Sequence, residues 1–212
     1  MPDENYWESY YASIPLATKP SPFAKDMLKL VSAQRQKIEG LSLIELGCGN
    51  GRDSVFFSGL GLQVLALDQC PKVVAALNRE HGSANLSFES ADFTNLEASN
   101  NHYDIVYSRF TLHAVNAEGE LRTLQWTSDA LTKGGLFLVE VRTVNDDFFG
   151  IGEEVEPDAW VDTHYRRFVR TEEFCKRVLA TGLEIVSFEE ARGFAPYGDE
   201  DPVVLRLIAR KP

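Results

Sequence analysis

The stretch LIELGCGNGR, residues 43–52, decides the fold. Residues 41–46 form a short apolar run of the kind found in buried strands, and three glycines follow directly in residues 47–51. The residues after them have a helical pattern. Glycine permits a positive φ and lets a ligand approach the backbone closely. The stretch therefore predicts a strand, a tight turn and a helix, with a binding site at the turn.

The spacing of these glycines argues against a dinucleotide ligand. A nicotinamide or flavin dinucleotide fingerprint has its third glycine at the sixth position of the motif, which here is Arg52. In this chain the third glycine, Gly51, stands at the fifth position. The ligand of the turn should therefore be another small molecule.

Strands and helices alternate along the rest of the chain. Ser21 followed by Pro22 has the form of a helix start, and Gly134 and Gly135 should end the helix before them. Residues 145–169 have no regular pattern. The predicted strands cover residues 63–67, 86–88, 103–108, 136–141, 183–188 and 203–209, and the predicted helices cover residues 21–31, 52–57, 71–77, 116–131 and 171–180.

The motif and the next strand together carry a family resemblance. The pattern Glu-x-Gly-x-Gly-x-Gly begins at Glu45, and an acid, Asp68, stands at the tip of the second strand. This combination resembles the class I S-adenosylmethionine-dependent methyltransferases, from about Leu43 to the end of the chain. The resemblance implies a Rossmann-like three-layer α/β/α sandwich whose seven-stranded sheet is mostly parallel with an antiparallel last strand. It also implies one domain over residues 1–212.

The resemblance assigns roles to the cofactor side. Glu45 would hold the amino group of the methionine moiety, Gly47 and Gly49 would line its path, and Asp68 would accept hydrogen bonds from the ribose hydroxyls. Asp92 would contact the adenine, although it could equally be a helix cap. The full predicted cofactor set is Glu45, Gly47, Cys48, Gly49, Asn50, Asp68, Gln69, Asp92, Phe93 and Ser108.

The acceptor should lie at the carboxyl edge of the sheet, because open α/β sheets bind ligands there. Several arginines near one mouth suit an anionic acceptor. The predicted acceptor-binding residues are Tyr11, Arg109, His113, Arg142, His164, Tyr165, Arg166 and Arg167, and the predicted catalytic residues are His113, His164 and Arg142. Arg166 and Arg167 could instead pair with surface acids, and His113 could be structural.

The need for a base depends on the acceptor. A hydroxyl acceptor would require proton removal, for which His113 or His164 is suited by its near-neutral pKa. A carboxylate or phosphate oxygen needs only positioning by arginine. The sequence leaves these alternatives open.

Two segments outside the central motif are expected to complete the site. Residues 1–35 are expected to form a helical lid, since Tyr6-Trp7 and Tyr10-Tyr11 resemble the aromatic lid of many small-molecule members. The same aromatic residues could instead staple the first helix. Residues 145–170 are expected to be an acceptor-site insertion.

Composition excludes other classes. A net charge of -11 disfavours binding to nucleic acid, and Ser108-Arg109-Phe110-Thr111 stands where nucleic-acid amino-methyltransferases have an Asn-Pro-Pro-Tyr signature. Three cysteines without a C-x-x-C pair indicate free thiols, and no metal is expected, with Asn145-Asp146-Asp147 taken as surface loop acids. No signal peptide or membrane span is recognised. We expect a cytoplasmic monomer or homodimer without a membrane partner.

The sequence therefore predicts an S-adenosylmethionine-dependent methyltransferase that acts at oxygen on a small anionic or sugar-like acceptor. An N-, S- or C-methyltransferase, including the thiopurine and tellurite detoxification types, is the alternative within the class. A catalytically silent S-adenosylmethionine-binding partner subunit is the alternative outside it.

Overall fold

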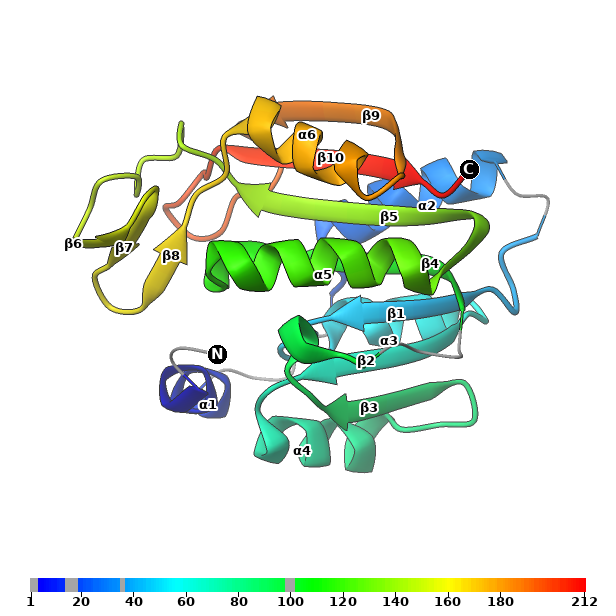
Figure 1. The fold of residues 1–212 in the computed structure, drawn as a ribbon. Coiled ribbons are helices and arrows are strands. Elements are labelled where there is room, and N and C mark those ends of the chain that lie inside the picture. Colours follow the sequence, from blue (N-terminus) through cyan, green and yellow to red (C-terminus); the bar gives the residue numbers. More distant parts are fainter. Residues whose placement is uncertain (1–3, 14–18, 35–36, 98–101) are drawn as a thin grey trace.

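A seven-stranded sheet forms the centre of the molecule (Figure 1). The computed structural model describes residues 4–13, 19–34, 37–97 and 102–212. The strand order is β3-β2-β1-β4-β5-β10-β9, and β10 runs antiparallel to both of its neighbours. The predicted fold is confirmed. The strands of this sheet are β1 (Ser42–Leu46), β2 (Gln63–Asp68), β3 (Leu86–Ser90), β4 (Tyr103–Arg109), β5 (Leu131–Arg142), β9 (Glu184–Ala191) and β10 (Val204–Arg210).

Helices cover both faces of the sheet because its inner strands are apolar on both sides. One core contains Leu124 and Phe174 from the helices on its face, and the other contains Phe23 and Leu77. The helices are α1 (Glu4–Ser13), α2 (Pro22–Gln34), α3 (Arg52–Gly59), α4 (Pro71–His81), α5 (Ala117–Ala130) and α6 (Thr171–Ala180), with short 3-10 turns η1 (Phe93–Asn95) and η2 (Leu112–Ala114).

The start of α2 follows the predicted cap. The Ser21 hydroxyl accepts a hydrogen bond from the backbone N–H of Ala24 at 3.0 Å. None of the helices in the described ranges is long and apolar enough to cross a membrane.

The junction between α5 and β5 differs from the prediction. The helix ends at Ala130, and β5 already begins at Leu131, so Gly134 and Gly135 lie within the strand and do not end the helix. Leu131 is buried and pairs with Tyr103 of β4. Strand pairing therefore starts directly after the helix, and the glycines accommodate a shift in its register.

Residues 145–169 contain a second, three-stranded antiparallel sheet, which the sequence did not indicate. Its strands are β6 (Glu153–Glu156), β7 (Ala159–Val161) and β8 (Tyr165–Arg167), too short for a clear alternating pattern. Trp160 packs against Phe149 with ring centroids 4.4 Å apart. The small sheet and α1 both lie at the edge where the parallel strands of the large sheet end (Figure 1).

A buried ion pair fixes this insertion to the large domain. Glu120 of α5 accepts hydrogen bonds from Arg167 and from Arg177, the latter at 2.5 Å. The carboxylate is fully buried, and the guanidinium of Arg167 also donates to the carbonyl of Val115 at 3.1 Å. Arg167 therefore has a structural partner, although not one of the surface acids.

Replacing Glu120 by alanine should destabilise the protein by about 3–5 kcal/mol, because it leaves the buried Arg167 without a compensating charge. Urea unfolding measures this change. The matched control is Glu118→Ala, which removes an exposed partner of Arg122 on the same helix and should leave the unfolding midpoint unchanged. Equal midpoints for the two variants would show that the Glu120 pair is not needed for stability.

Candidate cofactor and acceptor site

The glycine turn after β1 leaves almost no room above its backbone. Gly47 and Gly49 have φ of 75° and 54°, and Gly51 caps α3 at φ 75°. A Cβ added to Gly49 would lie 2.6 Å from the hydroxyl oxygen of Tyr11. Because glycine has no Cβ, neighbouring groups can lie against the backbone of this turn, and any other residue would clash with them.

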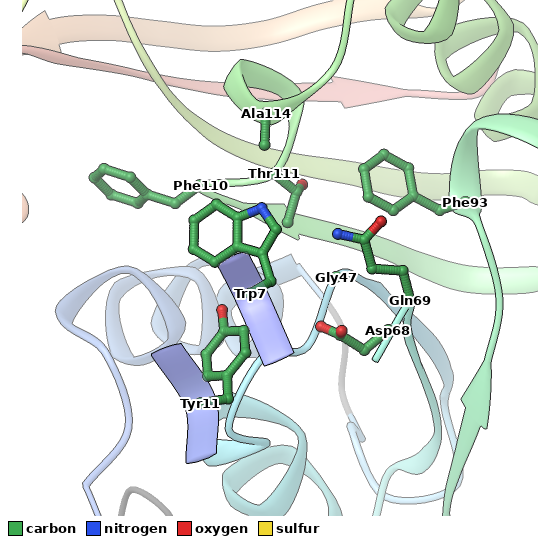
Figure 2. Close-up of a pocket in the computed structure, with 9 residues that line it drawn as sticks. All are labelled: Trp7, Tyr11, Gly47, Asp68, Gln69, Phe93, Phe110, Thr111 and Ala114. Carbon is green, nitrogen blue, oxygen red and sulfur yellow. The ribbon is translucent and has the colours of Figure 1, made fainter. Parts of the chain in front are cut away.

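Asp68 holds the turn from the end of β2. One oxygen of its carboxylate accepts the backbone N–H of Gly49 at 2.8 Å, and the other accepts that of Cys70 at 3.0 Å. Burial raises its pKa, while these N–H groups oppose the shift. A carboxylate has about four lone-pair sites, so Asp68 can still accept ligand hydroxyls. Asp68 lies on the wall of a small cavity of about 40 Å³ (Figure 2).

The small cavity has an apolar side suited to a planar ring. Phe93 points into it, beside Gln69 (Figure 2). Asp92 does not line it: its carboxylate caps η1, accepting from the backbone N–H and hydroxyl of Thr94 at 2.9 and 2.7 Å. The structure therefore gives Asp92 the helix-cap role that the sequence left open, and its contact with adenine stays a prediction.

Glu45 is the last residue but one of β1 and lies in a buried network of acidic side chains. Ser54 donates a hydrogen bond to its carboxylate, and burial followed by the charge of Asp53 raises its pKa well above the usual range. Asp53 is itself held by the backbone N–H of Ser21 at 2.6 Å and by the hydroxyl of Tyr107 at 2.8 Å. Two neighbouring buried acids favour a positively charged group beside them, which suits the amino group expected at Glu45.

A second cavity of about 420 Å³ joins this turn to the predicted acceptor residues. Glu45, Gly47, Cys48, Gly49 and Asn50 form one side of it. The residues that face them include Tyr11, Arg109, His113, Arg142, His164 and Arg166. The structure thus brings together six of the eight predicted acceptor residues with the predicted cofactor residues.

Two predicted acceptor residues, Tyr165 and Arg167, and two predicted cofactor residues, Asp92 and Ser108, line neither cavity. Arg167 is buried against Glu120, and the hydroxyl of Tyr165 donates to Glu156, so neither lines the cavity. Ser108 is fully buried, with its hydroxyl 2.5 Å from that of Thr111. Alternate residues of the short strand β8 point to opposite sides, which a sequence without a recognisable strand there could not reveal.

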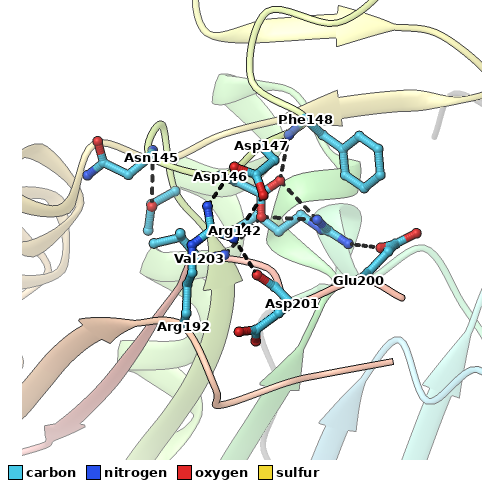
Figure 3. A network of polar contacts seen from close by, with 10 residues as sticks. Arg142, Asn145, Asp146, Asp147, Phe148, Arg192, Glu200, Asp201 and Val203 are labelled. Atoms are coloured by element: carbon cyan, nitrogen blue, oxygen red, sulfur yellow. Dashed lines mark hydrogen bonds and ion pairs between the residues drawn. The ribbon is translucent and has the colours of Figure 1, made fainter. Parts of the chain in front are cut away.

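The arginines of the large cavity differ in their partners. Arg109 forms an ion pair with the buried Glu140 at 2.9 Å. Arg142 binds Asp146 and Glu200, both at 3.0 Å (Figure 3). Within the described ranges, Arg166 has no carboxylate partner, and its guanidinium lies over the ring of Phe148 at 5.0 Å from the centroid.

The loop acids near Arg142 are not all at the surface. Asp146 is only 4% exposed, which corrects the prediction of a surface acid, whereas Asp147 is exposed and pairs with Arg192 (Figure 3). Their arginine partners explain why acids gather here. In the part of the chain that the structure describes, no three acids, histidines or cysteines are grouped as a metal site.

The two histidines of the large cavity have different surroundings. His113 is 4% exposed, packs edge-on against Phe110, and its Nδ1 has no hydrogen-bond partner among the described residues. Burial, then the charges of Arg142, His164 and Arg166, lower its pKa well below the usual range. His164 contacts the Thr163 hydroxyl through Nδ1 at 3.1 Å and stacks on Tyr6 with centroids 4.4 Å apart.

Several lining residues were missed by sequence reasoning. Arg52 begins α3 on the wall of the large cavity and has no ion pair in the described ranges. Its place directly after the glycine turn was a usable signal. Phe110 lines both cavities and has a φ of 55°, which is rare for a bulky residue. Nothing in the sequence indicates that strained conformation.

Comparisons with known proteins find similarity to methyltransferases. Residues 43–135 match the family described as a methyltransferase domain. Over 112 residues, 52% of the chain, it is 28% identical to a probable S-adenosyl-L-methionine-dependent methyltransferase TehB of Haemophilus influenzae. Over 157 residues, 70% of the chain, it is 26% identical to a ubiquinone biosynthesis O-methyltransferase of Cereibacter sphaeroides. The matches span 39% and 62% of these two relatives.

The fold also has solved counterparts. A crystal structure of an S-adenosylmethionine-dependent methyltransferase from Methanosarcina mazei superposes with a TM-score of 0.73 at 14% identity. The superposition covers 86% of this chain and 96% of that protein. At such identity the likeness concerns the fold alone.

Replacing Asp68 by alanine should weaken binding of S-adenosylmethionine by about 10- to 100-fold, because charge-assisted hydrogen bonds contribute about 1.5–3 kcal/mol each. Calorimetric titration measures the dissociation constant. The control is Glu89→Ala, an exposed acid near the end of the neighbouring strand β3, which should bind normally. Normal affinity in the Asp68 variant would overturn the ribose assignment.

Proposed function

We propose that the chain is an S-adenosylmethionine-dependent methyltransferase that methylates a small anionic or sugar-like acceptor at oxygen. Residues 43–135 match a methyltransferase domain family, and the fold resembles that of a solved S-adenosylmethionine-dependent methyltransferase. One observation carries the proposal. The cavity of about 420 Å³ is lined on one side by the glycine turn and on the other by arginines and histidines. Methyl transfer needs both reactants aligned in one enclosed space, which such a cavity supplies.

The residues present fit S-adenosylmethionine. Asp68 would accept the ribose hydroxyls, Glu45 would hold the amino group, and Phe93 would pack on the adenine in the small cavity. Gly47 and Gly49 have no Cβ, so other groups can contact their backbone closely. A Cβ on either residue would meet a neighbouring side chain. Arg52 is placed to hold the carboxylate of the methionine moiety. When bound, the cofactor supplies an electrophilic methyl group.

The rest of the work falls to the chain's own side chains. Arg109 and Arg142 are locked by Glu140, Asp146 and Glu200, so they form a rigid wall for the acceptor. Trp7 and Tyr11 line both cavities and cover the glycine turn, which would exclude water from the transfer. These contacts support an active methyltransferase over a catalytically silent partner subunit, because the acceptor side of the cavity is lined by polar side chains.

We further propose that α1 is the lid and residues 145–170 the acceptor-site insertion. Tyr6 of α1 stacks on His164 of the insertion, and Lys72 of α4 binds Glu8 at 2.8 Å. The helix is thus tied to both sides of the site by contacts that are individually weak. Weak contacts allow a lid to open for exchange of the cofactor.

The lid can be followed through Trp7. In a W126F/W160F variant, Trp7 is the only tryptophan of the chain, and its fluorescence should change when S-adenosylhomocysteine binds, because Trp7 lines both cavities. A fluorescence titration checks this against the dissociation constant from calorimetry. A constant emission at saturating ligand would remove α1 from the cofactor site.

The proposed function is tested by calorimetric titration with S-adenosylmethionine, S-adenosylhomocysteine, NAD and ATP. The first two should bind selectively, because the glycine spacing does not match a dinucleotide motif. Selective binding followed by transfer of a labelled methyl group to an oxygen of a small acid or sugar supports the proposal. Transfer to nitrogen, sulfur or carbon would contradict the O-methylation, and no binding of either ligand would contradict the methyltransferase function.

A further inference from the structure

Arg166 and His113, both on the wall of the large cavity, stand at opposite ends of one row of packed aromatic and guanidinium groups. The His113 ring packs against Phe110 with centroids 5.3 Å apart, and the guanidinium carbon of Arg142 lies 5.4 Å from the Phe110 centroid. On its other side, Arg142 lies 5.1 Å from the centroid of Phe148, over which Arg166 also lies. The row therefore separates a cation from a histidine by a fixed spacer.

The cation at one end is ready for an anion. Of the lining arginines, Arg109 and Arg142 already have carboxylate partners, whereas Arg166 has none in the described ranges. Burial, followed by repulsion from Arg142, lowers the pKa of Arg166. The negative charge of a ligand carboxylate or phosphate would offset the burial of Arg166 and its repulsion from Arg142. The planar guanidinium fork matches either group.

The histidine at the other end is unsuited to binding an anion. The groups that face His113 are Arg109, Arg142, His164 and Arg166, all of them cationic or able to become so. They keep its imidazole neutral, and its Nδ1 is buried without a partner. An unpaired buried nitrogen destabilises the site unless a ligand completes its hydrogen bonding. A neutral imidazole nitrogen without a proton is an acceptor for a hydroxyl.

We propose that the acceptor is a hydroxyl-bearing anion whose carboxylate or phosphate binds Arg166 and whose hydroxyl gives its proton to His113. This inference rests on the proposed function and narrows it, since the anion serves recognition and the hydroxyl is the oxygen that is methylated. The O–H bond breaks with its proton going to the unprotonated imidazole nitrogen of His113, while the oxygen bonds to the methyl carbon as the bond from that carbon to sulfur breaks, with its electron pair left on sulfur.

His164 does not compete for this role. Its Nδ1 contacts Thr163, and its ring is stacked on Tyr6 of α1. Direct methylation of the anionic oxygen is also disfavoured, because it needs no proton acceptor and would leave His113 buried without a function.

The first arm of the test uses inorganic phosphate as the probe, with S-adenosylhomocysteine present. Phosphate should bind the wild-type protein, and R166Q should weaken it by about 10- to 100-fold, as expected for lost charge-assisted hydrogen bonds. The matched control is R170Q, an exposed arginine after the same insertion that pairs with Asp158. Absence of phosphate binding, or equal binding in R166Q, overturns the anion assignment.

The second arm uses matched acceptors and labelled S-adenosylmethionine. Hydroxybenzoates and sugar phosphates offer a hydroxyl with a carboxylate or a phosphate, and benzoate offers the anion alone. Transfer to the hydroxyl of one of the first two sets supports the proposal and distinguishes carboxylate from phosphate. Ester formation on benzoate, or no transfer to any member while S-adenosylmethionine binds, overturns it. Failure of S-adenosylmethionine to bind overturns the proposed function instead.

The two residues should separate kinetically on the accepted substrate. R166Q should raise KM with little change in kcat, whereas H113N should lower kcat by at least about 100-fold with KM little changed. Because the pKa of His113 is lowered, kcat of the wild type should hold as the pH falls below the usual histidine range and drop only as it passes the lowered pKa. S-adenosylhomocysteine binding by H113N confirms that it folds. A kcat unchanged in H113N overturns its role as base.

Discussion

The hydrogen bonds from Gly49 and Cys70 to the carboxylate of Asp68 are the constraint on which the site depends. They join the turn after β1 to the end of β2, so one side chain fixes the shape of the glycine backbone. The backbone N–H of Cys48 adds a bond to the carbonyl of Leu67 at 2.8 Å. A ligand that reaches Asp68 therefore meets a preformed turn, and little ordering is required when it binds.

The acceptor side of the site is also fixed by contacts between neighbouring strands, and here the contacts are ion pairs. Glu140 of β5 is fully buried between Arg109 of β4 and Arg206 of β10, the latter at 2.7 Å. β4 and β5 end near the cavity and the antiparallel β10 begins there, so the pairs fix the directions of the side chains at this edge of the sheet. Buried ion pairs contribute little net stability, and their use here is consistent with positioning. Arg166, outside this network, has no carboxylate partner in the described ranges, and neither has Arg52 on the cofactor side.

How much of the fold and of the site could be predicted depends on how far apart in the sequence the interacting residues lie. The fold class and the places of Glu45 and Asp68 near strand ends were predictable because a strand, a glycine turn and a strand-end acid lie within one short segment. The small sheet β6–β8 was not, because its strands are three or four residues long and are held by Trp160, Phe149 and the distant Glu120. For the same reason, the sequence could not show that Arg166 lines the cavity while the adjacent Arg167 is buried against Glu120.

The net charge of -11 bears on the choice of acceptor. An acidic surface repels anions at long range, yet four arginines line the large cavity, and salt screens long-range repulsion within about 8–10 Å. An anion that enters the cavity therefore exchanges a weak surface repulsion for close contact with Arg166 in a partly desolvated site. The acidic surface and the arginine-lined cavity have opposite charge, which favours small anions, since a large polyanion would remain in contact with the acidic surface. The same acidic surface that disfavours nucleic acid is thus compatible with a small acidic acceptor.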